Sequence, residues 1–189
     1  MRHWSAGADF LALLVDHVTA TRPEMIVECG SGLSTLMLAR CCALNGAGRV
    51  FSLEQAPEHA ARTRAELARY GLEAQATVLE ARLLPYALGG QTHAWYDLAG
   101  LPEAVIDVLV IDGPPGWSAP LARYPALPLL HDRLGQTCTV FLDDAARPDE
   151  QVILRRWRAE FPDLVVTEVS TARGCGVLQR RAQSSGEAL

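Results

Sequence analysis

The chain of 189 residues contains no lysine, so all 17 of its basic residues are arginines. They are outnumbered by 22 acidic residues, which gives a formal net charge of -5. A nucleic-acid-binding surface normally carries clustered positive charge, so this composition argues against nucleic acid as a partner. A small neutral or cationic partner fits the composition better.

Paired cysteines and long hydrophobic runs are also missing. The five cysteines are odd in number, show no Cys-x-x-Cys spacing and lie mostly in apolar stretches, which predicts reduced, buried thiols in a cytoplasmic protein. The apolar stretch 10–18 is interrupted by Asp16 and His17, is too short to span a bilayer and lacks a signal-peptide layout. It predicts a first helix and no membrane partner.

Apolar runs rich in β-formers alternate with stretches of helical period along most of the chain. The expected strands cover residues 25–29, 49–53, 75–79, 107–111, 137–142, 164–169 and 176–178. The expected helices cover residues 34–44, 57–70, 125–134 and 148–161.

This alternation predicts a doubly wound α/β fold, a mostly parallel seven-stranded sheet with helices on both faces. The last two strands are joined too briefly for a parallel crossover, so they should form an antiparallel hairpin. With 49% hydrophobic residues, the chain is long enough for one buried core, which we expect over residues 1–180. The polar residues 181–189 are expected to form a disordered tail.

The most informative segment reads Ile-Val-Glu-Cys-Gly-Ser-Gly-Leu-Ser-Thr over residues 26–35. It predicts a strand, a tight Gly-x-Gly turn and a helix, an arrangement that holds a nucleotide-like ligand against bare backbone. A dinucleotide site would have glycine where Thr35 stands, and Glu28 before the turn would repel a phosphate. Glu54 ends the next strand, at an offset that suits the two hydroxyls of a ribose. The ligand indicated is a cationic nucleoside without phosphate.

At these residues the chain resembles the class I S-adenosylmethionine-dependent methyltransferases, over about residues 24–180. The resemblance implies an enzyme of that activity, with S-adenosylmethionine as its cofactor. It implies a cofactor site made of Glu28, Gly30, Ser31, Gly32, Ser34, Glu54, Gln55, Ala81, Arg82 and Asp112. In that family, residues in the position of Glu80-Ala81-Arg82 contact the adenine.

Three further acids follow the fourth and fifth expected strands. Asp112, Asp143 and Asp144 could converge on one divalent cation, since oxygen ligands suit Mg²⁺. The layout is similar to the catechol-type O-methyltransferases, in which the metal lowers the pKa of the attacking hydroxyl. Those enzymes usually carry a lysine shortly after the first acid, and this chain has none. Alternatively, Asp144 approaches a helix N-terminus, with Arg147 as its counter-ion.

A closer likeness is to small bacterial class I methyltransferases with the motifs Asp-Gly-Pro-Pro-Gly (112–116), Arg-Tyr-Pro-Ala-Leu-Pro (123–128) and Leu-Asp-Asp-Ala-x-Arg (142–147). The two prolines after Gly113 stiffen their loop, which favours Trp117, Arg123 and Tyr124 as substrate contacts. Trp117 and Tyr124 could equally cover the edge of the sheet.

Other aromatic and imidazole groups have weaker claims. The segment around Tyr86, His93, Trp95 and Tyr96 is rich enough in aromatics to suggest a substrate lid. His93 and His131 are candidate bases, although a lone histidine is more often structural.

The sequence therefore predicts a methyltransferase that acts on a small molecule, most simply at a hydroxyl oxygen, with Asp112, Asp143 and Asp144 at its catalytic centre. Two alternatives stay open. One is a nicotinamide-dependent oxidoreductase on the same general fold, which Glu28 and Thr35 disfavour. The other is a non-catalytic domain that keeps the cofactor pocket.

Overall fold

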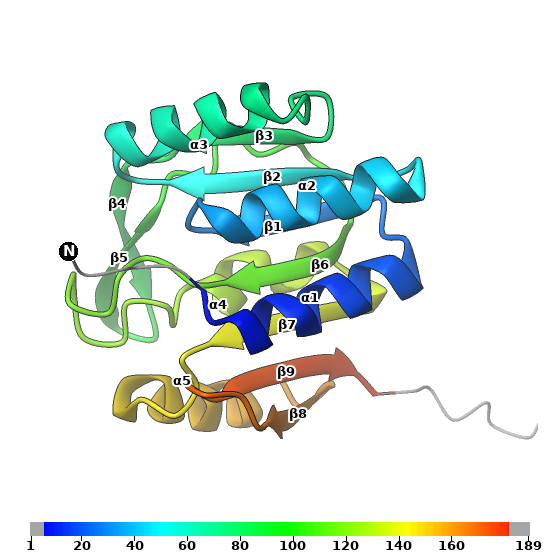
Figure 1. Cartoon of the computed structure of the whole chain (residues 1–189). Coiled ribbons are helices and arrows are strands. Elements are labelled where there is room, and N and C mark those ends of the chain that lie inside the picture. Colours follow the sequence, from blue (N-terminus) through cyan, green and yellow to red (C-terminus); the bar gives the residue numbers. More distant parts are fainter. Residues whose placement is uncertain (1–5, 182–189) are drawn as a thin grey trace, which may run out of the picture.

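The computed structural model describes residues 6–181, which form a seven-stranded sheet between two layers of helices (Figure 1). In spatial order the strands are β3 (Ala76–Glu80), β2 (Arg49–Glu54), β1 (Met25–Cys29), β6 (Ile106–Ile111), β7 (Leu134–Asp143), β9 (Cys175–Arg180) and β8 (Leu164–Val169). β9 runs antiparallel to both β7 and β8, and the other pairings are parallel. The predicted sheet and its C-terminal hairpin are confirmed.

Helices cover both faces of the sheet, as predicted. α1 (Ala8–Thr21), α2 (Leu33–Asn45) and α3 (Pro57–Arg69) lie on the face turned toward the viewer in Figure 1. α4 (Ala126–Leu130), the 3₁₀ turn His131–Arg133 and α5 (Pro148–Glu160) lie on the other. Proline opens both α3 and α5, at a position where its missing N–H has no helical partner to lose.

The two helical layers explain why the central strands are apolar throughout. Every residue of β1 is buried, and successive side chains point to opposite faces. Ile26 packs in the cluster that includes Leu38 of α2, while Val27 packs in the cluster that includes Trp157 of α5. Because neither face of β1 meets water, alternation of polar and apolar residues is unnecessary there.

Two local predictions were wrong. The aromatic segment predicted as a lid forms an antiparallel hairpin, β4 (Leu83–Leu88) and β5 (Gln91–Tyr96), in which Trp95 and Tyr96 are fully buried. The helix predicted over 125–134 is shorter, and Leu134 already belongs to β7. Leu134 pairs with Ile106 of β6, so a contact distant in sequence overrides the local helical pattern.

All five cysteines are buried and free, as predicted. The predicted tail lies outside the described residues except for Arg181, whose N–H donates to the carbonyl of Asp163. Within residues 6–181, no helix combines the length and apolar character needed to cross a membrane.

Candidate active site at the carboxyl ends of the strands

The glycine turn after β1 has the backbone conformation that the sequence suggested. Gly30 has a φ of 99°, in a region that side chains rarely tolerate, and a Cβ there would lie 3.5 Å from the backbone nitrogen of Gly113. Gly32 has a φ of 162°, which is extended backbone, and acts as the N-cap of α2. Glycine is therefore required by conformation at position 30 rather than at position 32.

Glu54 ties the end of β2 to this turn. Its Oε2 accepts hydrogen bonds from the backbone N–H of Ser31 at 3.0 Å and from the Ser31 hydroxyl at 2.9 Å. Its Oε1 accepts from the N–H of Ala56 at 3.0 Å. The carboxylate is held in one orientation before any ligand arrives, and each oxygen keeps lone-pair capacity for a further donor.

Glu28 lies beneath the turn and is 1% exposed. The Thr35 hydroxyl donates to its Oε2 at 2.5 Å, while its Oε1 has no hydrogen-bond partner among the described residues. Burial raises the pKa of Glu28 to about 7, although the hydroxyls of Ser34, Thr35 and Ser52 act in the opposite direction. The fold thus holds an acid at a position where ionisation is costly.

A cavity of about 610 Å³ opens beside the turn at the carboxyl ends of β1, β2 and β6. Such a volume is typical of small-molecule sites. Its lining includes, of the predicted cofactor residues, Gly30, Ser31, Ser34, Glu54, Gln55 and Asp112. On the other side it includes Trp117, Arg123 and Asp144 from the predicted substrate and catalytic residues.

The remaining predicted residues do not line this cavity, namely Glu28, Gly32, Ala81, Arg82, Tyr124 and Asp143. Tyr124 is 4% exposed, and its hydroxyl donates to Glu160 of α5 at 2.8 Å. Arg123 contacts the acids, whereas its chain neighbour Tyr124 packs in the core, so the structure does not bring Tyr124 to this cavity. Ala81 is likewise buried, although its N–H donates to the carbonyl of Glu54 at 2.8 Å.

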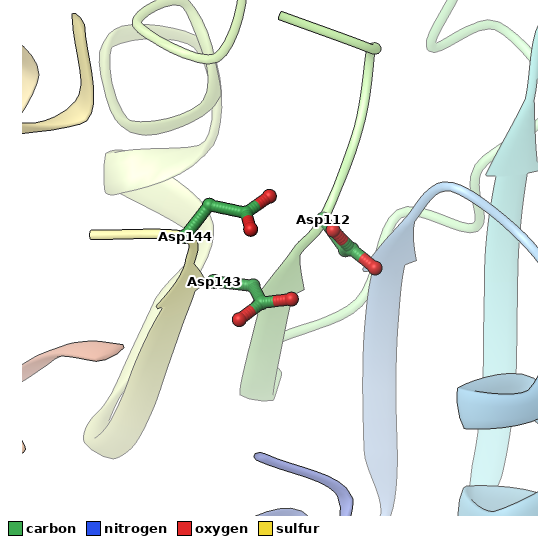
Figure 2. A group of neighbouring side chains, drawn as sticks. All are labelled: Asp112, Asp143 and Asp144. Atoms are coloured by element: carbon green, nitrogen blue, oxygen red, sulfur yellow. The ribbon is translucent and has the colours of Figure 1, made fainter. Parts of the chain in front are cut away.

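The three predicted acids do meet (Figure 2). Asp112 follows β6, whereas Asp143 ends β7 and Asp144 follows it, and these two strands are parallel neighbours. One carboxylate oxygen from each residue lies within 4.8 Å of the others. Asp144 adopts a φ of 58°, an uncommon conformation for a residue with a side chain, which is often found at functional sites.

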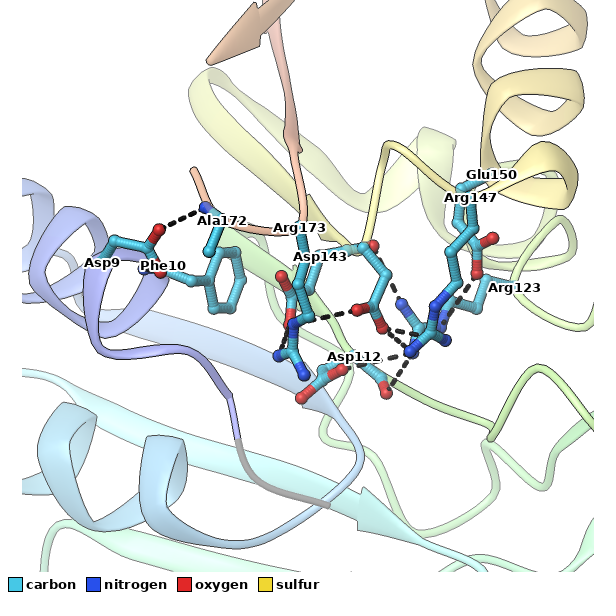
Figure 3. Close-up of polar contacts among 10 residues, drawn as sticks. Asp9, Phe10, Asp112, Arg123, Asp143, Arg147, Glu150, Ala172 and Arg173 are labelled. Atoms are coloured by element: carbon cyan, nitrogen blue, oxygen red, sulfur yellow. Dashed lines mark hydrogen bonds and ion pairs between the residues drawn. The ribbon is translucent and has the colours of Figure 1, made fainter. Parts of the chain in front are cut away.

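Three arginines from separate segments converge on these acids (Figure 3). Arg123 Nη2 lies 3.2 Å from Asp112 Oδ1 and 3.1 Å from Asp144 Oδ2. Arg147, the N-cap of α5, lies 3.0 Å from Asp144 Oδ2. Arg173, from the turn between β8 and β9, lies 2.7 Å from Asp143 Oδ2 and 3.0 Å from Asp144 Oδ1.

Burial is the largest influence on the pKa values of Asp112 and Asp143. It raises the pKa of Asp112, an effect that Arg123 opposes and the neighbouring Asp143 and Asp144 reinforce. Burial also raises the pKa of Asp143. Asp112 therefore combines access to the cavity with a greater affinity for protons than an ordinary aspartate.

Sequence reasoning missed Arg173, Glu150 and the position of Tyr96. Glu150 lies on α5, with its Oε1 3.7 Å from Arg123 Nε. The Tyr96 hydroxyl is buried, has no hydrogen-bond partner among the described residues, and belongs to a side chain that lines the cavity. No motif marks Arg173, because its place depends on the pairing of Cys175 with Asp143 across β9 and β7.

The two histidine candidates lie elsewhere. His131 Nε2 is 3.0 Å from Asp163 Oδ2, and its ring packs on Phe161. The ring of His93 packs on Tyr124, at a centroid distance of 5.0 Å. Neither residue lines the cavity, so neither is placed to act as its base.

A sheet with this strand order and a ligand-sized cavity at its carboxyl edge defines a Rossmann-like α/β protein. Residues 27–145 match the family model described as a methyltransferase domain, and the chain belongs to that family. No curated protein sequence matches the chain.

Solved structures with the same fold cover almost all of the chain. The methyltransferase PaMTH1 of Podospora anserina, solved with S-adenosylhomocysteine (SAH), is 15% identical over 95% of this chain and 81% of its own, with a TM-score of 0.73. The O-methyltransferase TomG of Streptomyces achromogenes, in complex with S-adenosylmethionine (SAM), is 17% identical over 96% and 84%, with a TM-score of 0.71. The O-methyltransferase of Bacillus cereus, solved with SAH, is 19% identical over 95% and 84%, also with a TM-score of 0.71.

Proposed function

We propose that the protein transfers a methyl group from SAM to a hydroxyl oxygen of a small molecule. The observation that carries the proposal is the cavity that joins Glu54 and the Gly30 turn at one side to Asp112 and the arginines at the other. Membership of the methyltransferase-domain family supports the reaction class. The O-methyltransferases TomG and the B. cereus enzyme, which have this fold and bind SAM or SAH, support the donor and the acceptor atom.

The donor side of the cavity suits a nucleoside without phosphates. Glu54 is oriented by Ser31 and Ala56 and offers acceptor oxygens to ribose hydroxyls. Gly30 leaves its backbone open to the ligand, and the carboxylate of Glu54 beside this turn would repel a pyrophosphate. When bound, SAM supplies a methyl group made electrophilic by the sulfonium. We assign Glu28, Gly30, Ser31, Gly32, Ser34, Glu54 and Gln55 to this side.

The acceptor side combines donors with one accessible acid. Arg147 and Arg173 are partly exposed, line the cavity and can only donate hydrogen bonds, so they suit the oxygen atoms of an acceptor. Trp117 is 73% exposed at the same cavity and offers an aromatic face. In the proposed step an oxygen–carbon bond forms as the sulfur–carbon bond breaks, and the hydroxyl proton passes to Asp112.

Much of this catalysis is alignment, because holding nucleophile and methyl in line removes a large entropic part of the barrier. The oxidoreductase alternative is weaker, since Thr35 occupies the place of the third glycine of a dinucleotide motif. The free, buried thiols favour a cytoplasmic location for the enzyme.

Calorimetric titration with SAH tests the donor site. We expect Glu54→Ala to lose at least about tenfold in affinity, in line with the loss of charge-assisted hydrogen bonds. The matched control is Glu73→Ala, an exposed acid between α3 and β3, which should bind as the parent does. Equal affinity of Glu54→Ala and the parent would refute the ribose assignment.

Ligand protection against thermal unfolding separates the alternatives. SAH should raise the unfolding temperature of the parent protein, and NADH should leave it unchanged. The reverse pattern would favour the oxidoreductase. Transfer of labelled methyl from SAM to a panel of hydroxylated compounds then tests catalysis, and SAH binding without turnover on any of them would favour a non-catalytic domain.

A further inference from the structure

The acids that follow β6 and end β7 form a cluster in which a metal ion is one candidate ligand. The resemblance to catechol-type enzymes implies a divalent ion among Asp112, Asp143 and Asp144, and their oxygens lie close enough together to share one. The chemistry of the donor set agrees with Mg²⁺ or Mn²⁺. The positively charged side chains around those oxygens do not agree with a bound cation.

Guanidinium groups already engage most of the oxygens that an ion would use. Both carboxylate oxygens of Asp144 are paired, Oδ1 with Arg173 and Oδ2 with Arg123 and Arg147. Asp112 Oδ1 is paired with Arg123, and Asp143 Oδ2 with Arg173. The nitrogen–oxygen distances are 2.7 to 3.2 Å, and three of these contacts are charge-assisted hydrogen bonds, from Arg123 to Asp112 Oδ1 and Asp144 Oδ2 and from Arg173 to Asp143 Oδ2. Asp143 Oδ1 and Asp144 Oδ1 accept no hydrogen bond from the described residues.

The central arginine is built into the fold. Arg123 is 3% exposed, and its guanidinium also donates to the backbone carbonyls of Asp112 at 2.8 Å and Asp143 at 2.9 Å. Glu150 of α5 adds a third carboxylate around it, after those of Asp112 and Asp144. A buried guanidinium with this many partners stays in place, because its removal would leave carboxylates and carbonyls unpaired.

An ion bound at ordinary Mg²⁺ distances, about 2.1 Å from these oxygens, would sit directly against fixed positive charges. The acids already carry three guanidinium counter-charges, so a further double charge would gain little attraction and meet strong repulsion. We infer that Arg123, Arg147 and Arg173 occupy the place of a divalent ion, and that this acid cluster binds no metal.

Without a metal, side chains alone must bind the acceptor oxygen and remove its proton. A metal binds the acceptor oxygen directly and helps to remove its proton, whereas a guanidinium only donates hydrogen bonds and never takes a proton. Among the described residues, the hydrogen bond and ion pair of the Asp112 carboxylate go to Oδ1, and none goes to Oδ2. In the proposed reaction this oxygen is therefore the one free to receive the proton.

Titration with Mn²⁺, followed by calorimetry and by electron paramagnetic resonance, tests the inference on the purified protein. The parent should show no saturable binding below about 1 mM, a range in which an open carboxylate site would bind. Arg173→Ala frees Asp143 Oδ2 and Asp144 Oδ1, and should gain Mn²⁺ affinity by at least about tenfold. The control is Arg158→Ala, which breaks a half-exposed ion pair with Glu168 and should gain nothing.

Two outcomes would overturn the inference. One is saturable Mn²⁺ binding by the parent that Asp144→Asn abolishes. The other is an Arg173→Ala protein that retains its fold, judged by its cooperative thermal unfolding, and gains no Mn²⁺ affinity. Since the readout is metal binding, it is independent of the proposed reaction, which SAH titration and methyl transfer test separately.

Discussion

Replacing Glu28 by glutamine should stabilise the ligand-free protein at alkaline pH. Glu28 is 1% exposed, lies beneath the glycine turn and has one carboxylate oxygen without a partner among the described residues. Glutamine keeps the shape and an oxygen that can accept from Thr35, but it never ionises. The substitution therefore removes the cost of a buried charge and preserves the packing.

The size of this change in the free energy of unfolding follows from the pKa of Glu28. Burial raises the pKa of Glu28 from an ordinary 4.5 to about 7. A folded state with a raised pKa binds its proton more tightly than the unfolded state, so this contribution to stability is full below pH 4.5 and is lost as the pH rises through 7. At pH 8 the loss is about 3 kcal/mol, and at pH 5 it is under about 1 kcal/mol.

Denaturant unfolding followed by tryptophan fluorescence at pH 5 and pH 8 measures the effect. The advantage of Glu28→Gln over the parent should grow by about 2 kcal/mol between the two pH values. A difference in unfolding free energy that is the same at both pH values would report only how well the glutamine amide fits the site. In the control Glu73→Gln, at an exposed position, the free energy of unfolding should stay within about 0.5 kcal/mol of the parent value at both pH values. An advantage that does not increase with pH would refute the reasoning.

Two further substitutions test the turn and the cavity. Gly30→Ala should destabilise the protein by about 1–2 kcal/mol more than Gly32→Ala in the same unfolding assay. Gly30 has a φ of 99°, in a region that disfavours a side chain, whereas the φ of Gly32, 162°, is that of extended backbone. Equal losses would contradict this account. Tyr96→Phe should weaken SAH binding about three- to tenfold without loss of thermal stability, because the buried hydroxyl has no partner among the described residues and is left to serve a ligand. A lower unfolding temperature with unchanged SAH affinity would instead make that hydroxyl structural.

The glycine turn and the acids at the strand ends were predictable for a local reason. A buried parallel strand is a short apolar run, and the residue that ends it is marked by a change to polar character. Carboxyl ends of parallel neighbours meet at one edge of the sheet. Knowing that β6 and β7 are neighbours thus suffices to bring Asp112 and Asp143 together.

The hairpin β4–β5 was missed although the sequence marks its turn. The dipeptide Gly89-Gly90 separates the two strands, and both glycines have a positive φ, as a tight hairpin turn requires. The burial of Trp95 and Tyr96 was not predictable in this way, because they become core only when the sheet and helices enclose them. Tyr124 illustrates the same limit, because its chain neighbour Arg123 faces the cavity and Tyr124 does not. The direction of a loop side chain depends on packing rather than on spacing.

The sequence by itself determined the order of strands and helices, the glycine turn and the row of acids, since hydrophobic period and strand ends are local properties of the chain. The tertiary structure decided most of what neutralises those acids. Arg147 is three residues from Asp144 and was predicted as its counter-ion, and the structure confirms the pair. Arg123 and Arg173 come from segments distant in sequence, and only folding brings their guanidinium groups within 3.2 Å of the carboxylates. Ion pairing depends on distance in space, so a pattern that indicates a metal site along the chain can form an arginine-occupied one in the fold.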